Sequence, residues 1–96
     1  MSKQPVGTPD VFARAVSAEV RAEMGRQNVS ARELARRVKR SGPYVQDRLN
    51  ENKTFNLNDL EVISGALGLT PSEFIDRVIK NAPNAVGVGP DPLATE

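Results

Sequence analysis

Apolar side chains recur along this chain every three to four residues, the spacing of one face of an α-helix. The first and longest stripe consists of Phe12, Val16, Val20 and Met24, with Ala15 beside them. It follows Thr8 as a capping residue, Pro9 as a first-turn proline and Asp10 near the positive end of the helix dipole. The pattern therefore predicts a helix from about residue 9 to residue 27, with the stripe as its buried face.

Two shorter stripes follow over residues 30–50, in SARELARRVKRSGPYVQDRLN. The first predicts a helix over residues 31–39, for which Ser30 is the cap and Glu33 completes a capping box. The second predicts a helix from residue 42 to residue 50 or 51, with Ser41 as the cap and Pro43 in the first turn. The stripe positions are Leu34, Ala35 and Val38, then Tyr44, Val45, Arg48 and Leu49. Two helices and a short turn within about twenty residues match the size of a helix-turn-helix unit that reads DNA.

Two more helices are predicted after a polar loop over residues 52–56, in which Phe55 is expected to anchor the core. The fourth helix begins after Asn56 or Asn58 and ends at Gly68, a residue suited to a left-handed stop. Its inner side is expected to consist of Leu57, Leu60, Ile63, Ala66 and Leu67. The fifth helix opens with the cap, proline and capping-box set Thr70-Pro71-Ser72-Glu73 and continues to about residue 80. Its apolar positions are Phe74, Ile75, Val78 and Ile79.

The predicted architecture is an all-α fold, a compact five-helix domain over residues 8–81. No segment alternates like a strand and none repeats. None of these helices would be stable alone in water, so their stripes must share one core. Residues 1–7 are expected to form a flexible lead. Residues 82–96 are rich in proline and glycine and have no periodic apolar face, so a disordered tail is expected there.

The chain contains neither cysteine nor histidine, which narrows its chemistry. Disulfides, thiolate metal sites and histidine acid–base catalysis are excluded, and a zinc site is not expected. No serine has an activating base, so no enzyme activity and no cofactor are predicted. Glu19, Glu23 and Glu33 are interpreted as ion-pair partners of nearby arginines. No apolar run reaches the roughly 20 residues of a membrane span and no signal-peptide core is present, so a cytoplasmic protein is predicted.

The charge of the chain is unevenly distributed, although its net value is only +1. Residues 30–53 contain seven basic and three acidic side chains, net +4, whereas residues 54–96 contain two basic and six acidic ones, net −4. A basic block on a two-helix unit is the expected electrostatic signature of a surface that binds nucleic acid. The alternative is an arginine-rich helix face that is merely solvated.

Several landmarks of the chain resemble a known family over about residues 10–80. They are Leu34-Ala35, Tyr44-Val45 and the stretch from Asp59-Leu60-Glu61-Val62-Ile63 to Ala66-Leu67-Gly68-Leu69. The family is the Xre/Cro–cI type of helix-turn-helix transcriptional regulators of bacteria and phages. The spacing of Val45 and Arg48-Leu49-Asn50 is similar to that of an actinobacterial, phage-like branch. The resemblance implies a lambda-repressor-like DNA-binding fold.

Three features depart from the usual pattern of this family. Ala31 stands where a glutamine that buttresses a phosphate contact is common. Lys39 and Arg40 stand where the turn usually carries a glycine and then an apolar residue. The stretch from Val45 to Leu49 is one residue longer than the commoner spacing.

Candidate DNA contacts are assigned by residue chemistry and by position in the two-helix unit. The predicted base contacts are Gly42, Pro43, Gln46, Asp47, Arg48 and Asn50. The amides suit adenine, the aspartate suits cytosine and the arginine suits guanine or phosphate, while the glycine and proline allow close approach or contact with a thymine methyl. The predicted backbone contacts are Ser30, Arg32, Arg36, Lys39, Arg40, Ser41, Tyr44 and Lys53. Such contacts position a protein on DNA without reading its sequence.

The predicted function is a sequence-specific, double-stranded DNA-binding transcriptional regulator, with repression expected. The second helix of the motif, about residues 42–51, would enter the major groove, and a homodimer on DNA would read two half-sites. The alternative is an antitoxin-like or adaptor module that uses the same fold to bind a protein through its fourth and fifth helices or its tail.

Overall fold

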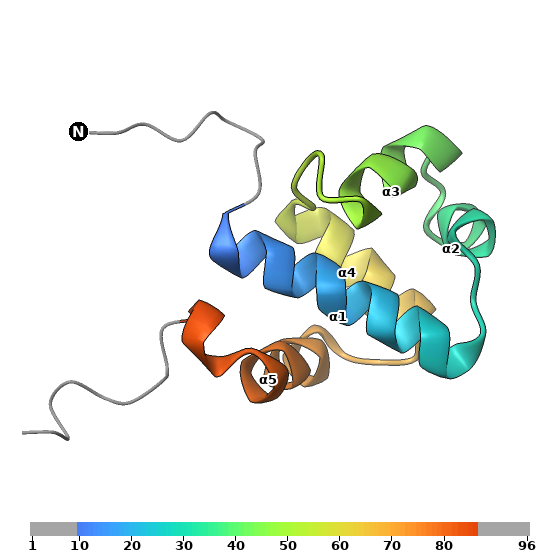
Figure 1. Cartoon of the computed structure of the whole chain (residues 1–96). Coiled ribbons are helices and arrows are strands. Elements are labelled where there is room, and N and C mark those ends of the chain that lie inside the picture. The colour runs from blue at the N-terminus through green and yellow to red at the C-terminus, as the bar shows by residue number, and fades with distance from the viewer. Residues whose placement is uncertain (1–9, 87–96) are drawn as a thin grey trace, which may run out of the picture.

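The computed structural model describes residues 10–86, and this part of the chain is entirely helical (Figure 1). Its helices are α1 (Val11–Gln27), α2 (Ala31–Val38), α3 (Gly42–Leu49), α4 (Leu57–Ala66) and α5 (Pro71–Asn81), followed by the short 3₁₀ helix η1 (Pro83–Val86). The predicted all-α, five-helix architecture is therefore confirmed. None of the helices between residues 10 and 86 combines the length and hydropathy required to cross a bilayer.

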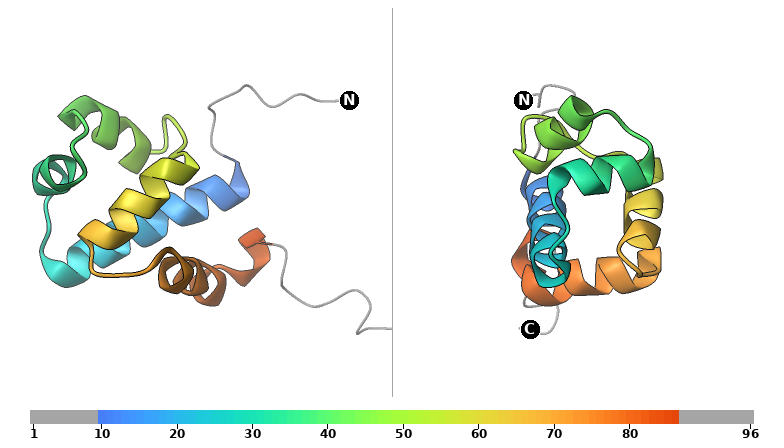
Figure 2. Two further views of the ribbon diagram at one scale, coloured as in Figure 1. Left: turned by 180° about the vertical axis from the view of Figure 1, so that it is seen from behind. Right: turned by 90° about the vertical axis from the view of Figure 1, so that its right-hand side faces the viewer.

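The helices surround one core, and α1 is the element that joins its two halves. It packs against α3 on one side and against α5 and η1 on the other, while α2 packs against α3 and α4 (Figures 1 and 2). The largest fully buried apolar side chains come from five different helices: Val20, Leu34, Val45, Ile63, Phe74 and Val78. Phe55 is buried as well, which confirms the predicted anchor in the loop before α4. The stripes thus meet in one core, as their spacing predicts.

Every α-helix begins at a side chain that accepts a hydrogen bond from a backbone N–H of the first turn. These caps are Asp10, Ser30, Ser41, Asn56 and Thr70. Full capping boxes form at Asn56 with Asp59 and at Thr70 with Glu73. The box predicted at Ser30 is only half formed, because the Glu33 carboxylate binds Arg36 and Arg37 instead of returning to the cap.

The start of α1 differs from the prediction. Asp10 accepts the hydrogen bond of the Val11 N–H at 2.8 Å and is the cap of α1. The predicted cap Thr8 and first-turn Pro9 lie outside the described residues. Asp10 suits this position because its carboxylate also faces the positive end of the helix dipole.

Two side chains predicted to be buried are exposed. Phe12 is 44% exposed and Leu57 is 83% exposed, although both fit the periodicity of their helices. Each lies in the first turn of its helix, and together with Phe55 they line a pocket at the end of the bundle. Periodicity identifies the inner face of a helix, but it does not show how far along the helix the neighbouring elements extend.

The end of the described chain packs against the domain. Residues 83–86 form η1, which contacts α1 and α5, so the segment expected to begin a disordered tail at residue 82 starts with packed structure. Apolar periodicity could not predict η1 because a single 3₁₀ turn is too short to show it. The remainder of the expected tail, residues 87–96, and the expected flexible lead, residues 1–7, lie outside the described residues.

A buried pair of carboxylates joins α5 to α1. Glu19 and Glu23 on α1 are 4% and 5% exposed. Arg77 of α5 contacts Glu23 at 2.6 Å, and Asn81 of α5 donates to Glu19 at 2.8 Å, while Arg26 binds both carboxylates. Burial raises the pKa of Glu23, but the hydrogen bonds from Gln27 and Arg26, together with the charges of Arg77 and Arg26, lower that pKa below its ordinary value. The interpretation of Glu19, Glu23 and Glu33 as arginine partners is confirmed.

Candidate nucleic-acid interface

The turn between α2 and α3 is made by residues 39–41, and its backbone explains one departure from the family pattern. Lys39 adopts a left-handed conformation with φ of 59°, and its N–H closes the end of α2 on the carbonyls of Ala35 and Arg36. A glycine is the usual residue in this conformation because it has no Cβ to clash. Lys39 thus fills a glycine position and places a cation at the surface of the turn.

The outer face of α3 is short, polar and free of bulky side chains. Gly42, Pro43, Gln46 and Asn50 are exposed, and Asp47 is partly exposed. The Gln46 amide donates to the Asn50 Oδ1 at 3.1 Å, so the two amides lie side by side on this face. Each amide retains donor and acceptor groups, which are the groups required to pair with an adenine edge.

An open groove of about 560 Å³ separates the N-terminal part of α3 from α2. Its walls include three arginines, Arg32, Arg36 and Arg40, and the first residues of α3, Gly42 and Pro43. The groove is therefore basic on the α2 side and sterically open on the α3 side. Gln46 of α3 lines the same groove.

The cations around this face differ in whether they have a partner. Arg32, Lys39 and Lys53 are exposed, and their side chains make no ion pair or hydrogen bond within residues 10–86. Arg36 is instead held by Glu33 through two hydrogen bonds of 3.0 and 2.6 Å, and Arg37 binds the same carboxylate at 2.9 Å. These hydrogen bonds, the one from Arg36 first, lower the pKa of Glu33 to about 2. Glu33 is ionised at neutral pH and partly neutralises Arg36.

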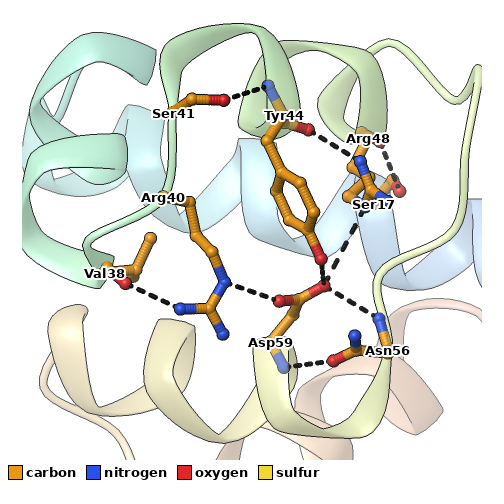
Figure 3. A network of polar contacts seen from close by, with 8 residues as sticks. All are labelled: Ser17, Val38, Arg40, Ser41, Tyr44, Arg48, Asn56 and Asp59. Carbon is orange, nitrogen blue, oxygen red and sulfur yellow. Dashed lines mark hydrogen bonds and ion pairs between the residues drawn. The ribbon is translucent and has the colours of Figure 1, made fainter.

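A buried carboxylate fixes α3 on α4 (Figure 3). Asp59 is 1% exposed, and its Oδ2 accepts the Tyr44 hydroxyl at 2.8 Å while its Oδ1 accepts the Arg40 Nε at 3.1 Å. The backbone N–H of Asn56 also donates to Oδ2, at 3.0 Å. One carboxylate thus joins the turn before α3, the first turn of α3 and the start of α4.

Arg48 lies on the inner side of α3 within the same network. Its guanidinium covers the Tyr44 ring at 3.5 Å and donates to the Tyr44 carbonyl at 3.1 Å, and only 16% of the side chain is exposed. Its Nε is buried without a hydrogen-bond partner and lies 3.9 Å from Asp59 Oδ2. Arg48 extends the stripe of α3 because its stem and planar head pack like an apolar residue.

The network changes the roles open to three residues predicted to contact DNA. Arg48, predicted as a base contact, and Tyr44, predicted as a backbone contact, direct their polar groups into the molecule. Arg40 lines the groove but gives its guanidinium to Asp59 and to the Val38 carbonyl. Arg36 is paired with Glu33, and Ser30 and Ser41 are helix caps. The other candidates on and around α3 are exposed or partly exposed, and their side chains form no hydrogen bond or ion pair with another element of the described chain.

The opposite end of α3 is tied to α1 by two side chains. Ser17 donates to the Arg48 carbonyl at 3.0 Å, and Arg21 donates to the Leu49 carbonyl at 2.6 Å and pairs with Glu51 at 3.1 Å. These bonds satisfy carbonyls that the end of a helix leaves without partners. Sequence reasoning assigned no role to Asp59, Ser17 or Arg21. Only Asp59 carried a signal, as the acidic residue three positions after the cap Asn56.

Two short helices are joined here by a tight turn. The second helix has an exposed polar face, and unpaired cations lie around it. Together these features define a helix-turn-helix DNA-binding domain. The sequence profile of the Cro/C1-type HTH DNA-binding domain matches residues 19–80, and the chain belongs to this family. Domains of this family bind DNA and are not enzymes, so the chain is a DNA-binding protein.

The fold is similar to two crystal structures of the clp gene regulator ClgR from Corynebacterium glutamicum. In one, the similarity covers 82% of this chain and 84% of that chain, with 22% identity and a TM-score of 0.68. In the other it covers 77% and 95%, with 22% identity and a TM-score of 0.66. A search of curated protein sequences found no significant match.

Proposed function

We propose that this protein is a sequence-specific regulator of transcription that represses by placing α3 in the major groove of its operator. The observation that carries the proposal is the outer face of α3, where two adjacent amides stand clear of other side chains and unpaired cations flank them. The similarity in fold to a protein described as a gene regulator supports the same role. Occupation of an operator by so compact a domain would block access of the polymerase.

The candidate contacts divide by chemistry. Gln46 and Asn50 are the proposed base readers, Asp47 suits a cytosine, and Gly42 and Pro43 allow α3 to approach the bases closely. Arg32, Lys39 and Lys53 are the proposed phosphate contacts, together with the backbone amides behind the caps Ser30 and Ser41. Arg36 contributes less charge because Glu33 pairs with it.

We assign a positioning role, in place of direct contact with DNA, to Arg40, Tyr44 and Arg48. Their polar groups meet Asp59 or the backbone of α3, so they position the helix that reads the bases. This role explains why an arginine occupies the usual apolar position of the turn, since Arg40 has a buried carboxylate to bind.

A single α3 reads only a few base pairs, so two copies on neighbouring half-sites are the expected binding unit. Operators of such dimers are palindromic because the protein pair is two-fold symmetric. We place this activity in the cytoplasm, where bacterial DNA lies.

Selection of bound sites from random duplex DNA tests the proposal. The expected winner is a palindrome with half-sites about one helical turn apart. Gln46→Ala should relax the preference at one position of each half-site, by roughly 1–3 kcal/mol of discrimination. Asp76→Ala is the matched control, because Asp76 is an exposed polar side chain of α5 outside the face, and it should leave the selected sequence unchanged.

Two results would count against this function. Failure to enrich any sequence would remove sequence-specific binding. Tight, salt-insensitive binding to a protein through α4 and α5, without affinity for DNA, would favour an adaptor or antitoxin-like module on the same fold.

A further inference from the structure

Exposed apolar side chains gather at one end of the bundle. Among the described residues, four large apolar side chains are exposed, and three of them lie in the first turns of α1 and α4: Val11 at 49%, Phe12 at 44% and Leu57 at 83%. Phe12 and Leu57 line one shallow pocket of about 90 Å³ with Phe55 below them. We call Val11, Phe12 and Leu57 the apolar end patch. Such patches on a small protein mark contacts with other molecules.

Part of this patch belongs to a segment that the DNA-binding family does not account for. The family match begins at residue 19, whereas α1 begins at Val11, so its first two turns precede the matched domain. These turns carry Val11 and Phe12, and α1 also contacts η1. The helix therefore begins eight residues before the matched region, with two exposed apolar side chains in its first turn.

The patch lies beside the C-terminal end of α3. Ser17 and Arg21 of α1 bind the last carbonyls of α3, and residues 50–56 lead directly from α3 to Leu57 (Figure 1). If a two-fold axis passed through the patch, the α3 helices of two copies would lie on either side of it with their C-terminal ends nearest the axis. Binding of two half-sites by a two-fold symmetric pair requires one recognition helix on each side of the axis.

The charges at the margin of the patch favour a second copy over a partner of one charge sign. Arg14, one turn after Val11, and Glu61, one turn after Leu57, are exposed, and their side chains make no ion pair or hydrogen bond within the described part of the chain. Such a margin, with one unpaired basic and one unpaired acidic side chain, is complementary to the same margin of a second copy. The apolar centre is likewise complementary to its own copy.

We propose that the apolar end patch is the contact between two copies of this chain bound at adjacent half-sites. This inference rests on the proposed function, and it identifies the surface through which the two copies of the proposed dimer meet. A patch of three side chains is far smaller than the roughly 20–30 residues that each partner contributes to a stable interface. The free protein is therefore monomeric at low concentration, and DNA creates the dimer by raising the effective concentration of one copy near another.

Titration of a palindromic operator and of a single half-site tests the contact. The wild-type chain should fill the palindrome cooperatively, and Leu57→Ser should reduce the cooperativity factor by about tenfold while binding to a single half-site is unchanged. Val62→Ser is the matched control, since Val62 is an exposed apolar residue of α4 outside the patch. Both substitutions replace exposed side chains, so the fold should tolerate them.

A measurement without DNA makes the test independent of the proposed function. Between about 0.05 and 1 mM protein, amide NMR shifts around Val11, Phe12 and Leu57 should change with concentration in the wild type and not in Leu57→Ser. Independent filling of the two half-sites, or equal behaviour of Leu57→Ser and Val62→Ser, would overturn the inference. Absent shift changes around the patch would do the same. Loss of half-site binding in the wild type would instead contradict the proposed function.

Discussion

At the scale of single residues, the position of each charged side chain relative to Asp59 decides its role. Arg40 and Arg48 have the same chemistry as Arg32, yet they bind Asp59 or the backbone of α3, whereas Arg32 has no partner in the described chain. A buried carboxylate needs such partners, because an unpaired charge in the interior is costly. Asp59 therefore turns two arginines from DNA contacts into supports of α3.

Asp59→Asn should test this support. The change removes the negative charge that Arg40 and Arg48 share, and it should lower the free energy of unfolding by about 2–4 kcal/mol, measured by urea denaturation. Glu33→Gln is the matched control, since it removes a carboxylate that binds two arginines at the surface, and its effect should be much smaller. Equal destabilisation by the two changes would contradict the role of Asp59.

The sequence predicted the exposed part of the site better than its supports. Gln46, Asn50 and the cations Arg32 and Lys53 lie on the surface of the two-helix unit, because helical spacing and capping determine which residues face outward. The roles of Tyr44, Arg48 and Asp59 depend on contacts between α3 and α4, in which Asp59 meets Tyr44, 15 residues before it, and Arg48. Spacing within one helix contains no information about such contacts.

At the scale of elements, the helix boundaries could be predicted because capping residues stand at them. The predicted caps Ser30, Ser41 and Thr70 and the left-handed stop at Gly68, with φ of 79°, are confirmed. The burial of individual side chains along each helix could not be predicted in the same way. Phe12 and Leu57 fit their stripes, but they line a pocket at the end of the bundle and are exposed.

The turn between α2 and α3 gives a prediction at this scale. Lys39→Gly should raise the free energy of unfolding by about 1 kcal/mol, because glycine adopts the left-handed conformation at φ of 59° without strain. The same change should weaken DNA binding, because it removes an unpaired cation from the interface. Denaturation in urea and titration of one DNA duplex measure the two effects.

Asn28 provides the control for this substitution. Its φ is 58°, so it has the same backbone conformation at the end of α1, but asparagine tolerates that conformation. Asn28→Gly should therefore change stability less than Lys39→Gly and leave DNA binding unaltered. A lower free energy of unfolding for Lys39→Gly than for the wild type would show that the lysine itself stabilises the turn.

At the scale of the whole molecule, the helices separate the charge that the sequence carries in blocks. The segment with net charge +4 forms α2, α3 and their flanking turns, and the segment with net charge −4 includes α4 and α5. Because the overall charge is only +1, attraction to DNA depends on orientation, with the basic side formed by α2 and α3 toward the phosphates. The affinity should nevertheless fall steeply with salt, with a slope of log K against log salt of about −3 or steeper for three phosphate contacts.

Lys53→Gln and Lys80→Gln together test whether this dependence comes from the interface or from total charge. Both lysines are exposed and unpaired in the described chain, and each substitution removes one positive charge from the molecule. Lys53 lies in the loop after α3, whereas Lys80 lies near the end of α5, on the opposite side of α1 from α3 (Figure 1). Since the slope counts counterions released by phosphate contacts, Lys53→Gln should make it shallower by about 0.9 and Lys80→Gln should not change it. Equal changes from both would mean that overall charge attracts the protein to DNA and that Lys53 makes no phosphate contact.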